Sequence, residues 1–406
     1  MSNPEENPFR PGAGHPPPYL AGREQEISAF KQHLSQGAIL KNVILTGLRG
    51  TGKTVLMDSR YKPLAQSEGW IWIGSDFSES SFLSEQHLCT RLLTDLSVYT
   101  SSLKIPTDRA GFGFAARLEA DYLTFDRLMD CLDQQPGLMV DKLKATLELV
   151  WAAAQVKGIR GIVFAYDEAQ LVTDHKDRHE YPLAILLECF QSLQKKGTKY
   201  LLLLTGLPTL FSRLVESRTY AERMFTVQEI GRLSDQDARK AIELPVKDSR
   251  WKFTEYGVHK IIDVTDGYPY FIQFICRETF DHLKSNPDDT GIPIEAITRK
   301  LDSDFFAGRW DQLTDRQREL LYCIAQLPDP DDEFTIGDLV DKSASIEMKK
   351  FTAGDISQML PRLIEKGLVF KNRHGRYSFA VPLFSRFILR KLEGKLRQGK
   401  LFERNP

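Results

Sequence analysis

The sequence predicts an α/β fold in which a parallel β-sheet is sandwiched by helices, followed by a small all-α lid and a C-terminal module of short helices and two strands. Three observations support this prediction. Short continuous apolar runs alternate with segments of helical periodicity, as in parallel sheets that are covered on both faces. One of these runs leads directly into a glycine-rich loop, and another ends in two acidic residues. Beyond residue 233 the pattern becomes helical throughout.

Length and composition are those of a multidomain globular protein. A chain of 406 residues is too long for one hydrophobic core and suits two or three domains. Its 54 Lys and Arg residues nearly balance 55 Asp and Glu residues, so a polyanionic partner would have to bind a local patch. No signal peptide and no apolar run of roughly 18 residues is present, so we expect a cytoplasmic protein without membrane contact. The scattered cysteines stand among apolar neighbours, which predicts buried reduced thiols.

Changes of pattern divide the chain into five segments. Residues 1–19 are proline-rich and predict an extended or partly disordered arm. The other segments are the α/β core at 20–233, the helical lid at 234–308, the C-terminal module at 309–395 and a basic tail at 396–406.

Within the core, five apolar runs are the expected strands, at 43–46, 70–74, 162–166, 200–205 and 225–230. The expected helices are a segment opening near Gly22, then 53–65, most of 82–160 and 182–194, with a loop at 106–117.

The glycine-rich loop matches the phosphate-binding pattern Gly-x-x-x-x-Gly-Lys-[Ser/Thr] in full. Its glycines let the backbone turn so that N–H groups point at nucleotide phosphates, and the helix that follows adds its positive dipole end. We expect Lys53 to reach the β and γ phosphates and the Thr54 hydroxyl to coordinate Mg²⁺. Since the motif follows a strand and opens a helix, a chance match is the weaker interpretation. The expected nucleotide-binding residues here are Gly47, Gly50, Thr51, Gly52, Lys53, Thr54 and Val55.

Acidic and hydroxyl residues end two further strands. The third expected strand leads into Asp167 and Glu168, the arrangement of a Walker B element. Asp167 would hold Mg²⁺, directly or through water, and Glu168 would polarise the attacking water. The fourth strand ends at Thr205, which resembles the sensor 1 position that contacts the γ-phosphate or the lytic water. An ordinary strand-ending threonine is the alternative.

In this order, the elements resemble those of AAA+ ATPases, in particular the branch of the origin-recognition, archaeal-type and STAND ATPases. The resemblance covers roughly residues 19–390 and rests on Gly22-Arg23-Glu24, on 47–54, on 166–170, on Thr205 and on Gly267-Tyr268-Pro269. It implies ATP with Mg²⁺, and it implies that Gly22 and Arg23 lie beside the adenine. The chain also lacks a guanine-reading Asn/Thr-Lys-x-Asp motif. For Arg23, an exposed charge at a helix start is the alternative.

The resemblance further implies a homo-oligomer in which a neighbouring subunit supplies an arginine finger. The candidates are Arg213, Arg218 and Arg223. Arg223 is favoured because it immediately precedes the fifth strand. In the lid, Gly267-Tyr268-Pro269 is closer to the Gly-x-Pro element of STAND ATPases than to a sensor 2 arginine, which implies that Pro269 packs near the nucleotide. Arg277 is a possible substitute for the missing arginine.

The C-terminal module predicts a winged helix, with helices at 315–325, 336–340 and 353–365 and a hairpin of strands at 368–371 and 376–380. The sequence is compatible with two partners of this module, double-stranded DNA and protein. Pro361, Asp355 and Glu365 in the third helix weaken the case for DNA. The candidate DNA contacts are Lys349, Lys350, Gln358, Arg362, Lys371, Arg373, His374 and Arg376, with Arg386, Arg390, Lys391, Lys395, Arg397 and Lys400 behind them.

Three functions follow as hypotheses. The first is an oligomerising AAA+ ATPase that hydrolyses ATP and acts on or beside DNA in replication, transposition or antiviral defence. The second is a STAND-like switch that controls a separate effector protein, since this chain carries no nuclease, protease or deaminase constellation of its own. The third is a regulator for which nucleotide is a structural ligand. Glu168 and Arg223 favour turnover over the third hypothesis.

Overall fold

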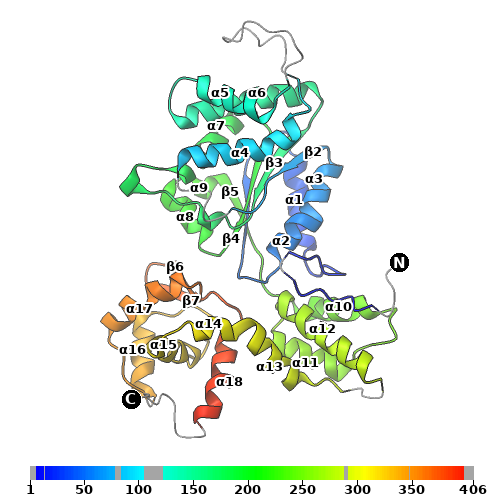
Figure 1. Ribbon diagram of the computed structural model, residues 1–406, viewed down its shortest axis with the longest axis vertical. Coiled ribbons are helices and arrows are strands. Elements are labelled where there is room, and N and C mark those ends of the chain that lie inside the picture. The colour runs from blue at the N-terminus through cyan, green and yellow to red at the C-terminus, as the bar shows by residue number, and fades with distance from the viewer. Residues whose placement is uncertain are drawn as a thin grey trace. The chain divides into compact units, whose positions relative to one another are not determined.

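The computed structural model describes residues 6–12, 14–77, 84–104, 122–287, 291–346 and 348–396. The chain forms two compact units (Figure 1). The core unit comprises Arg23–Gly47 and Lys53–Glu229, and the helical unit comprises Met1–Gly22, Leu48–Gly52 and Ile230–Pro406. The expected loop at 106–117 and the tail beyond residue 396 lie outside the described residues. The five-segment division of the chain stays a prediction.

The core unit is built on a five-stranded parallel sheet, which confirms the predicted fold class. The strands are β1 (Asn42–Thr46), β2 (Trp70–Ile73), β3 (Gly161–Tyr166), β4 (Tyr200–Gly206) and β5 (Phe225–Glu229). Their order across the sheet is β2-β3-β4-β1-β5. Strand β4 therefore lies between β1 and β3, although it follows both in the chain. Leu45 pairs with Thr205 and Tyr166 pairs with Leu204, so the carboxyl ends of these three strands are level.

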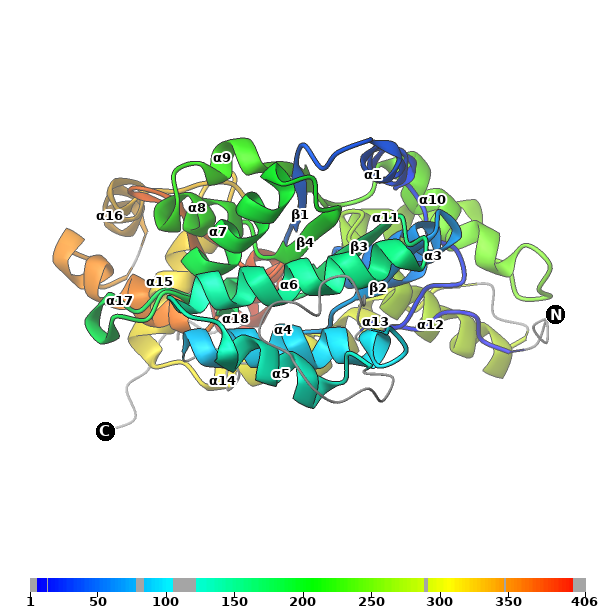
Figure 2. The same cartoon turned by 90° about the horizontal axis from the view of Figure 1, so that it is seen from above.

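Helices cover both faces of this sheet, because both faces of its strands are apolar. Ile162, Phe164 and Leu202 belong to one buried cluster with the helices on their side, among which α4, α5 and α6 run side by side (Figure 2). On the other side, the Phe30 ring stacks on Tyr61 at 4.1 Å. The helices of the unit are α1 (Glu24–Ser35), α4 (Glu85–Thr100), α5 (Phe125–Gln134), α6 (Met139–Val156), α7 (Pro182–Lys195), α8 (Leu210–Ser217) and α9 (Ala221–Met224), with short turns η4 (Ala169–Leu171) and η5 (Lys176–Arg178).

The helix predicted at 53–65 is continuous but is not α-helical throughout. It consists of α2 (Lys53–Leu56), the π-helical turn η1 (Met57–Tyr61) and α3 (Lys62–Ser67). The Tyr61 hydroxyl, at the end of the π turn, donates to Gln228 Oε1 at 2.6 Å and to the Glu26 carbonyl at 3.0 Å. These contacts bury Tyr61 completely and favour the locally wider turn.

The helical unit begins with the lid helices, as the helical spacing predicted. They are α10 (Asp235–Glu243), η6 (Leu244–Val246), α11 (Glu255–Thr265), α12 (Pro269–Ser285), α13 (Ile294–Leu301), the π-helical η7 (Asp302–Ala307) and α14 (Gly308–Asp311). Before α12, Gly267 has a φ of 71°, and a β-carbon there would lie 2.5 Å from the Leu233 carbonyl oxygen. Only glycine fits this turn, which sets the start of α12.

The C-terminal module follows in the predicted order of helices and hairpin. Its elements are α15 (Asp315–Ala325), α16 (Ile336–Ser345), α17 (Ala353–Glu365), β6 (Val369–Arg373), β7 (Arg376–Phe379) and α18 (Phe384–Leu396). Helix α15 begins with a complete capping box between Thr314 and Gln317. Pro361 lies inside α17, and β6 pairs antiparallel with β7. Phe306, Phe384 and Phe387 pack ring against ring, so α18 and η7 share one core.

The N-terminal arm packs on the lid. Phe9 is fully buried and stacks on Phe253 with ring centroids 5.8 Å apart. The Asn7 amide donates to the Arg277 carbonyl at 2.9 Å, and Arg277 Nη1 donates to the Phe9 carbonyl at 2.9 Å. The suggestion that Arg277 replaces a sensor 2 arginine is therefore not supported, since its guanidinium binds the arm.

Two further expectations concern the chain as a whole. All five cysteines are buried and free, as predicted. Among the described residues, none of the helices combines the length and the apolarity that crossing a membrane requires.

Candidate functional site

The strand order gathers the predicted catalytic residues at one edge of the sheet. Gly47 follows β1, Asp167 follows β3, and Thr205 lies near the end of β4 between them. Residues that are far apart in the chain thus become neighbours, because parallel strands end at the same edge. Ligand sites of open α/β sheets form at this carboxyl edge.

Asp167 is the centre of this group. Its carboxylate accepts hydrogen bonds from the hydroxyls of Thr54 and Thr205 and from the Glu168 N–H, the last at 2.8 Å. Only 5% of Asp167 is exposed. One carboxylate and two hydroxyls supply the hard oxygen ligands that Mg²⁺ prefers, so these residues fit a magnesium ion. The ordinary strand-end interpretation of Thr205 does not account for its contact with Asp167.

The phosphate loop has the backbone geometry that the motif predicts. Gly50 and Gly52 have φ values of 80° and 91°, and a β-carbon on Gly52 would meet no atom within 4 Å. The loop is closed on itself by the Thr51 hydroxyl, which donates to the Leu48 carbonyl at 2.9 Å. Lys53 Nζ donates to the Gly47 carbonyl at 2.9 Å, which holds its ammonium at the end of β1. These residues fit a bound phosphate chain.

The lid contacts the tip of this loop within the helical unit. The Tyr270 N–H, in the first turn of α12, donates to the Gly50 carbonyl at 3.2 Å. Pro269 is the first residue of the same helix, where its missing N–H costs no hydrogen bond. The predicted role of Pro269 beside the nucleotide stays a prediction.

Glu168 is held by a glutamine to which the sequence interpretation assigned no role. Glu168 has a left-handed backbone with a φ of 51°. Its carboxylate accepts from Gln170 Nε2, while Gln170 Oε1 accepts from the Leu207 N–H at 3.3 Å. A β-carbon at Gly206 would lie 2.4 Å from Gln170 Oε1. Two features of the sequence could have indicated this contact: a glutamine two residues after Glu168, and a glycine directly after Thr205.

Other carboxylates add negative charge near this group. Burial raises the pKa of the Asp58 carboxyl, and the charges of Asp167 and Asp76 raise it further, whereas Lys62 lowers it. Clustered carboxylates favour the binding of a cation. Among the described residues, however, no cluster of three or more His, Cys, Asp or Glu residues has the geometry of a complete metal site.

The remaining nucleotide-binding candidates lie in both units. Gly22 has a φ of 62°, and a β-carbon at this position would lie 2.7 Å from Asp237 Oδ2 in the helical unit. Arg23 caps the start of α1 in the core unit, is 6% exposed and forms an ion pair with Glu26 at 3.8 Å. The alternative of an exposed charge at Arg23 is therefore wrong. Val55 lies in α2. Contacts of Gly22, Arg23 and Val55 with a nucleotide stay predictions.

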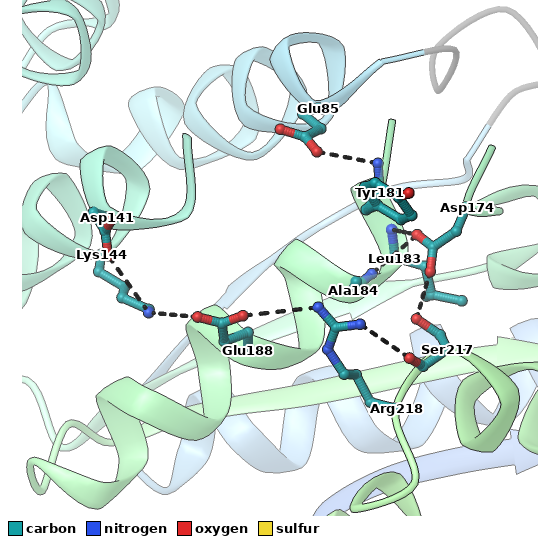
Figure 3. A network of polar contacts seen from close by, with 10 residues as sticks. All are labelled: Glu85, Asp141, Lys144, Asp174, Tyr181, Leu183, Ala184, Glu188, Ser217 and Arg218. Atoms are coloured by element: carbon teal, nitrogen blue, oxygen red, sulfur yellow. Dashed lines mark hydrogen bonds and ion pairs between the residues drawn. The ribbon is translucent and has the colours of Figure 1, made fainter. Parts of the chain in front are cut away.

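The three candidate finger arginines differ in their contacts. Arg213 Nη1 donates to the Gln170 carbonyl at 2.7 Å. Arg218 donates to the Ser217 carbonyl at 3.1 Å and lies 3.9 Å from a Glu188 carboxylate oxygen (Figure 3). Arg223 is exposed in α9 directly before β5. Its backbone N–H donates to the Tyr220 carbonyl at 3.0 Å, and its guanidinium forms no hydrogen bond or ion pair with the described residues. The choice of Arg223 as the arginine finger stays a prediction.

A polar network fixes the segment that follows the acidic strand. Asp174 accepts from the Leu183 and Ala184 N–H groups at 3.0 and 3.1 Å and from the Ser217 hydroxyl at 2.6 Å (Figure 3). It therefore caps α7 and joins α7 to α8. This arrangement positions the short segment from Glu168 to Gln170.

The candidate DNA contacts of the C-terminal module are mostly exposed. The exposed side chains are Lys349, Lys350, Gln358, Arg362, Lys371, His374 and Arg376. The Arg373 and Lys395 side chains and residues Arg397 and Lys400 lie outside the described part. Arg386 and Arg390 instead contact the lid: Arg386 donates to the Asp263 carbonyl at 2.7 Å, and Arg390 binds Asp302.

Known structures resemble this chain in fold. A family model described as a domain of unknown function, DUF8462, matches residues 303–388. No curated protein matches the chain. The solved Walker-type ATPase PABY2304 of Pyrococcus abyssi is 14% identical, with a TM-score of 0.58 over 91% of this chain and 96% of that one. The ADP form of the ORC2 protein of Aeropyrum pernix is 16% identical, with a TM-score of 0.54 over 97% and 98% of the two chains.

The chain has the fold of a Walker-type ATPase. At these identities the likeness concerns the fold, and at that level it confirms the predicted resemblance to the origin-recognition branch of AAA+ ATPases. Because the matches span more than nine-tenths of this chain, they include the helical unit as well as the sheet.

Proposed function

We propose that this protein is an ATPase that binds ATP with Mg²⁺ and hydrolyses it. One observation carries the proposal: the hydroxyls of Thr54 and Thr205 both donate to the Asp167 carboxylate. Thr54 also ends a complete phosphate-loop motif. Adenine as the base is supported by the ADP form of the structurally similar ORC2 protein.

Each residue then has a chemical role. The N–H groups of the phosphate loop and the Lys53 ammonium bind the phosphates and offset their charge. Thr54 and Asp167 would hold Mg²⁺, which supplies charge stabilisation on the phosphate oxygens. Glu168 accepts a proton from the attacking water, and Gln170 orients the Glu168 carboxylate. The Thr205 hydroxyl donates to the Asp167 carboxylate.

We also propose that the protein acts as a homo-oligomer in which Arg223 completes the site of a neighbouring subunit. The exposed and unpaired guanidinium beside β5 supports this proposal. The partner proposed for the C-terminal module is double-stranded DNA, because Lys371, His374 and Arg376 are exposed on the β6–β7 hairpin. Lys349 and Lys350 are exposed before α17, although α17 itself exposes Asp355 and Glu365 beside Arg362.

A second function is favoured by a separate observation. Pro269 begins α12 two residues after Gly267, the arrangement that resembles the Gly-x-Pro lid element of STAND ATPases. In that case ATP exchange would control a separate effector protein. Slow, concentration-independent hydrolysis that DNA does not stimulate would favour this switch.

The test of the ATPase site is Lys53→Ala, because this change removes the ammonium that binds the phosphates. Binding of a fluorescent ATP analogue and release of phosphate are measured together. We expect hydrolysis to fall by roughly 10²-fold or more. Lys31→Ala removes an exposed lysine of α1 and is the matched control. Equal turnover in the two variants would rule out this site.

A further inference from the structure

A second basic feature lies in the helical unit, apart from α17 and the hairpin. A groove of about 820 Å³ runs between the lid elements α11, α13 and η7 on one side and α18 on the other. Five cationic and three carboxylate side chains line it, so its charge is net positive. The cationic residues are Lys260, Arg299, Arg386, Arg390 and Lys391.

Two of these arginines fix the walls of the groove. Arg386 donates to the carbonyls of Asp263 and Val264 near the end of α11, at 2.7 and 3.5 Å. Arg390 binds both carboxylate oxygens of Asp302 in η7, at 2.5 and 3.0 Å. Since both arginines belong to α18, they hold this helix against the lid. The groove is therefore preformed, and it does not depend on a ligand to bring its walls together.

The other three cations are available to a ligand. Arg299 and Lys391 are exposed and Lys260 is half-buried, and they come from three separate helices. In the described part of the chain, no carboxylate forms an ion pair with Lys260, Arg299 or Lys391; Lys260 Nζ lies 5.6 Å from the centre of the Tyr256 ring. Asp302 is already neutralised by Arg390, which leaves Asp263 and Glu295 as the opposing charges.

We propose that this groove binds the sugar–phosphate backbone of DNA. Available cations that are distributed over three helices suit a ligand with repeated charges better than one compact anion. The sequence also continues the positive charge of α18 with further basic residues, Lys395, Arg397 and Lys400. Lysine and arginine side chains are the usual partners of phosphate oxygens, and such contacts position a protein on DNA without reading its sequence. This inference rests on the proposed DNA-directed function.

Binding of a fluorescein-labelled DNA duplex, measured by anisotropy at several salt concentrations, tests the proposal. The triple variant Lys260→Ala, Arg299→Ala, Lys391→Ala removes the available cations. Each phosphate contact contributes a salt slope of about 0.9 and therefore roughly fivefold in affinity at about 0.15 M salt. We expect the triple variant to lose on the order of 100-fold in affinity and about 2.7 in slope. Thermal melting checks that the variant is folded.

A matched pair on one helix sharpens the test. Arg299 lines the groove, whereas its neighbour Lys300 binds Glu278 at 2.8 Å and does not line it. Arg299→Ala should weaken binding roughly fivefold, Arg299→Lys should restore the salt slope, and Lys300→Ala should bind like the wild type.

Three outcomes would overturn the proposal, and the third is failure of the wild type to bind duplex. The first is unchanged affinity and slope in the triple variant while the wild type binds DNA, which would assign DNA to another surface. The second outcome uses labelled polyglutamate as a probe. If the triple variant loses polyglutamate binding but still binds the duplex, the ligand of the groove is an acidic protein. Failure of ATP hydrolysis in the wild type is a separate readout that concerns the ATPase site alone, and failure of the wild type to bind duplex would refute both DNA proposals.

Discussion

At the scale of single residues, Glu168 and its neighbours decide whether bound ATP is hydrolysed. Replacement of Glu168 by glutamine keeps the size of the side chain but removes the proton acceptor. We expect Glu168→Gln to bind ATP with unchanged affinity and to hydrolyse it about 10²–10³-fold more slowly, as measured by single-turnover phosphate release. Glu216→Gln, at an exposed position in α8, is the control. Normal turnover in Glu168→Gln would mean that another group polarises the water.

Gln170 is a positioning residue whose effect should pass through Glu168. Gln170→Ala removes the amide that bridges the Glu168 carboxylate and the Leu207 N–H. Because loss of such a supporting contact typically costs 10–100-fold, we expect kcat to fall by about tenfold while KM for ATP stays unchanged. The control is Gln155→Ala, at an exposed position at the end of α6. A rise of KM with unchanged kcat would refute this role.

At the scale of elements, the N-terminal arm contributes to the core of the helical unit. Phe9→Ala leaves a cavity against Phe253, so we expect the unit to lose about 3–5 kcal/mol of stability. Thermal unfolding followed by calorimetry should show the transition of this unit at lower temperature. In Arg10→Ala, the exposed side chain is removed but the backbone N–H still donates to Gln273, so the transition should not move. Equal transitions in both variants would show that the arm is dispensable.

Elements also differ in how far their sequences predict them. The strands and the helices of the C-terminal module follow from local patterns, such as the continuous burial of β1 and β4 and the cap of Thr314 on α15. The π turn in Met57–Tyr61 does not follow from local pattern, since it depends on the contact of Tyr61 with Gln228 in β5. Local propensity is overridden where a distant strand supplies the partner.

At the scale of the whole molecule, the proposed assembly makes a prediction about mixed subunits. If Arg223 acts on a neighbouring site, Arg223→Ala and Lys53→Ala proteins should each be inactive alone but should recover part of the activity when mixed. The reason is that a mixed interface pairs an intact phosphate loop with an intact arginine. Phosphate release against protein concentration, with wild type and with each variant at the same total concentration, checks this. If no mixture of the two variants hydrolyses ATP faster than each variant alone, Arg223 is not the arginine finger.

The sequence by itself determined the fold class, the phosphate loop and the acidic residues of the site, because each depends on short contiguous patterns: an apolar run, spaced glycines, an acidic pair after a strand. Only the tertiary structure decided which residues meet. The order β2-β3-β4-β1-β5 places Thr205 against Asp167, and the turn after β4 brings Leu207 to Gln170. It also separated Arg223 from Arg213 and Arg218, and it buried Arg23. These results depend on partners that are distant along the chain, which no local pattern encodes.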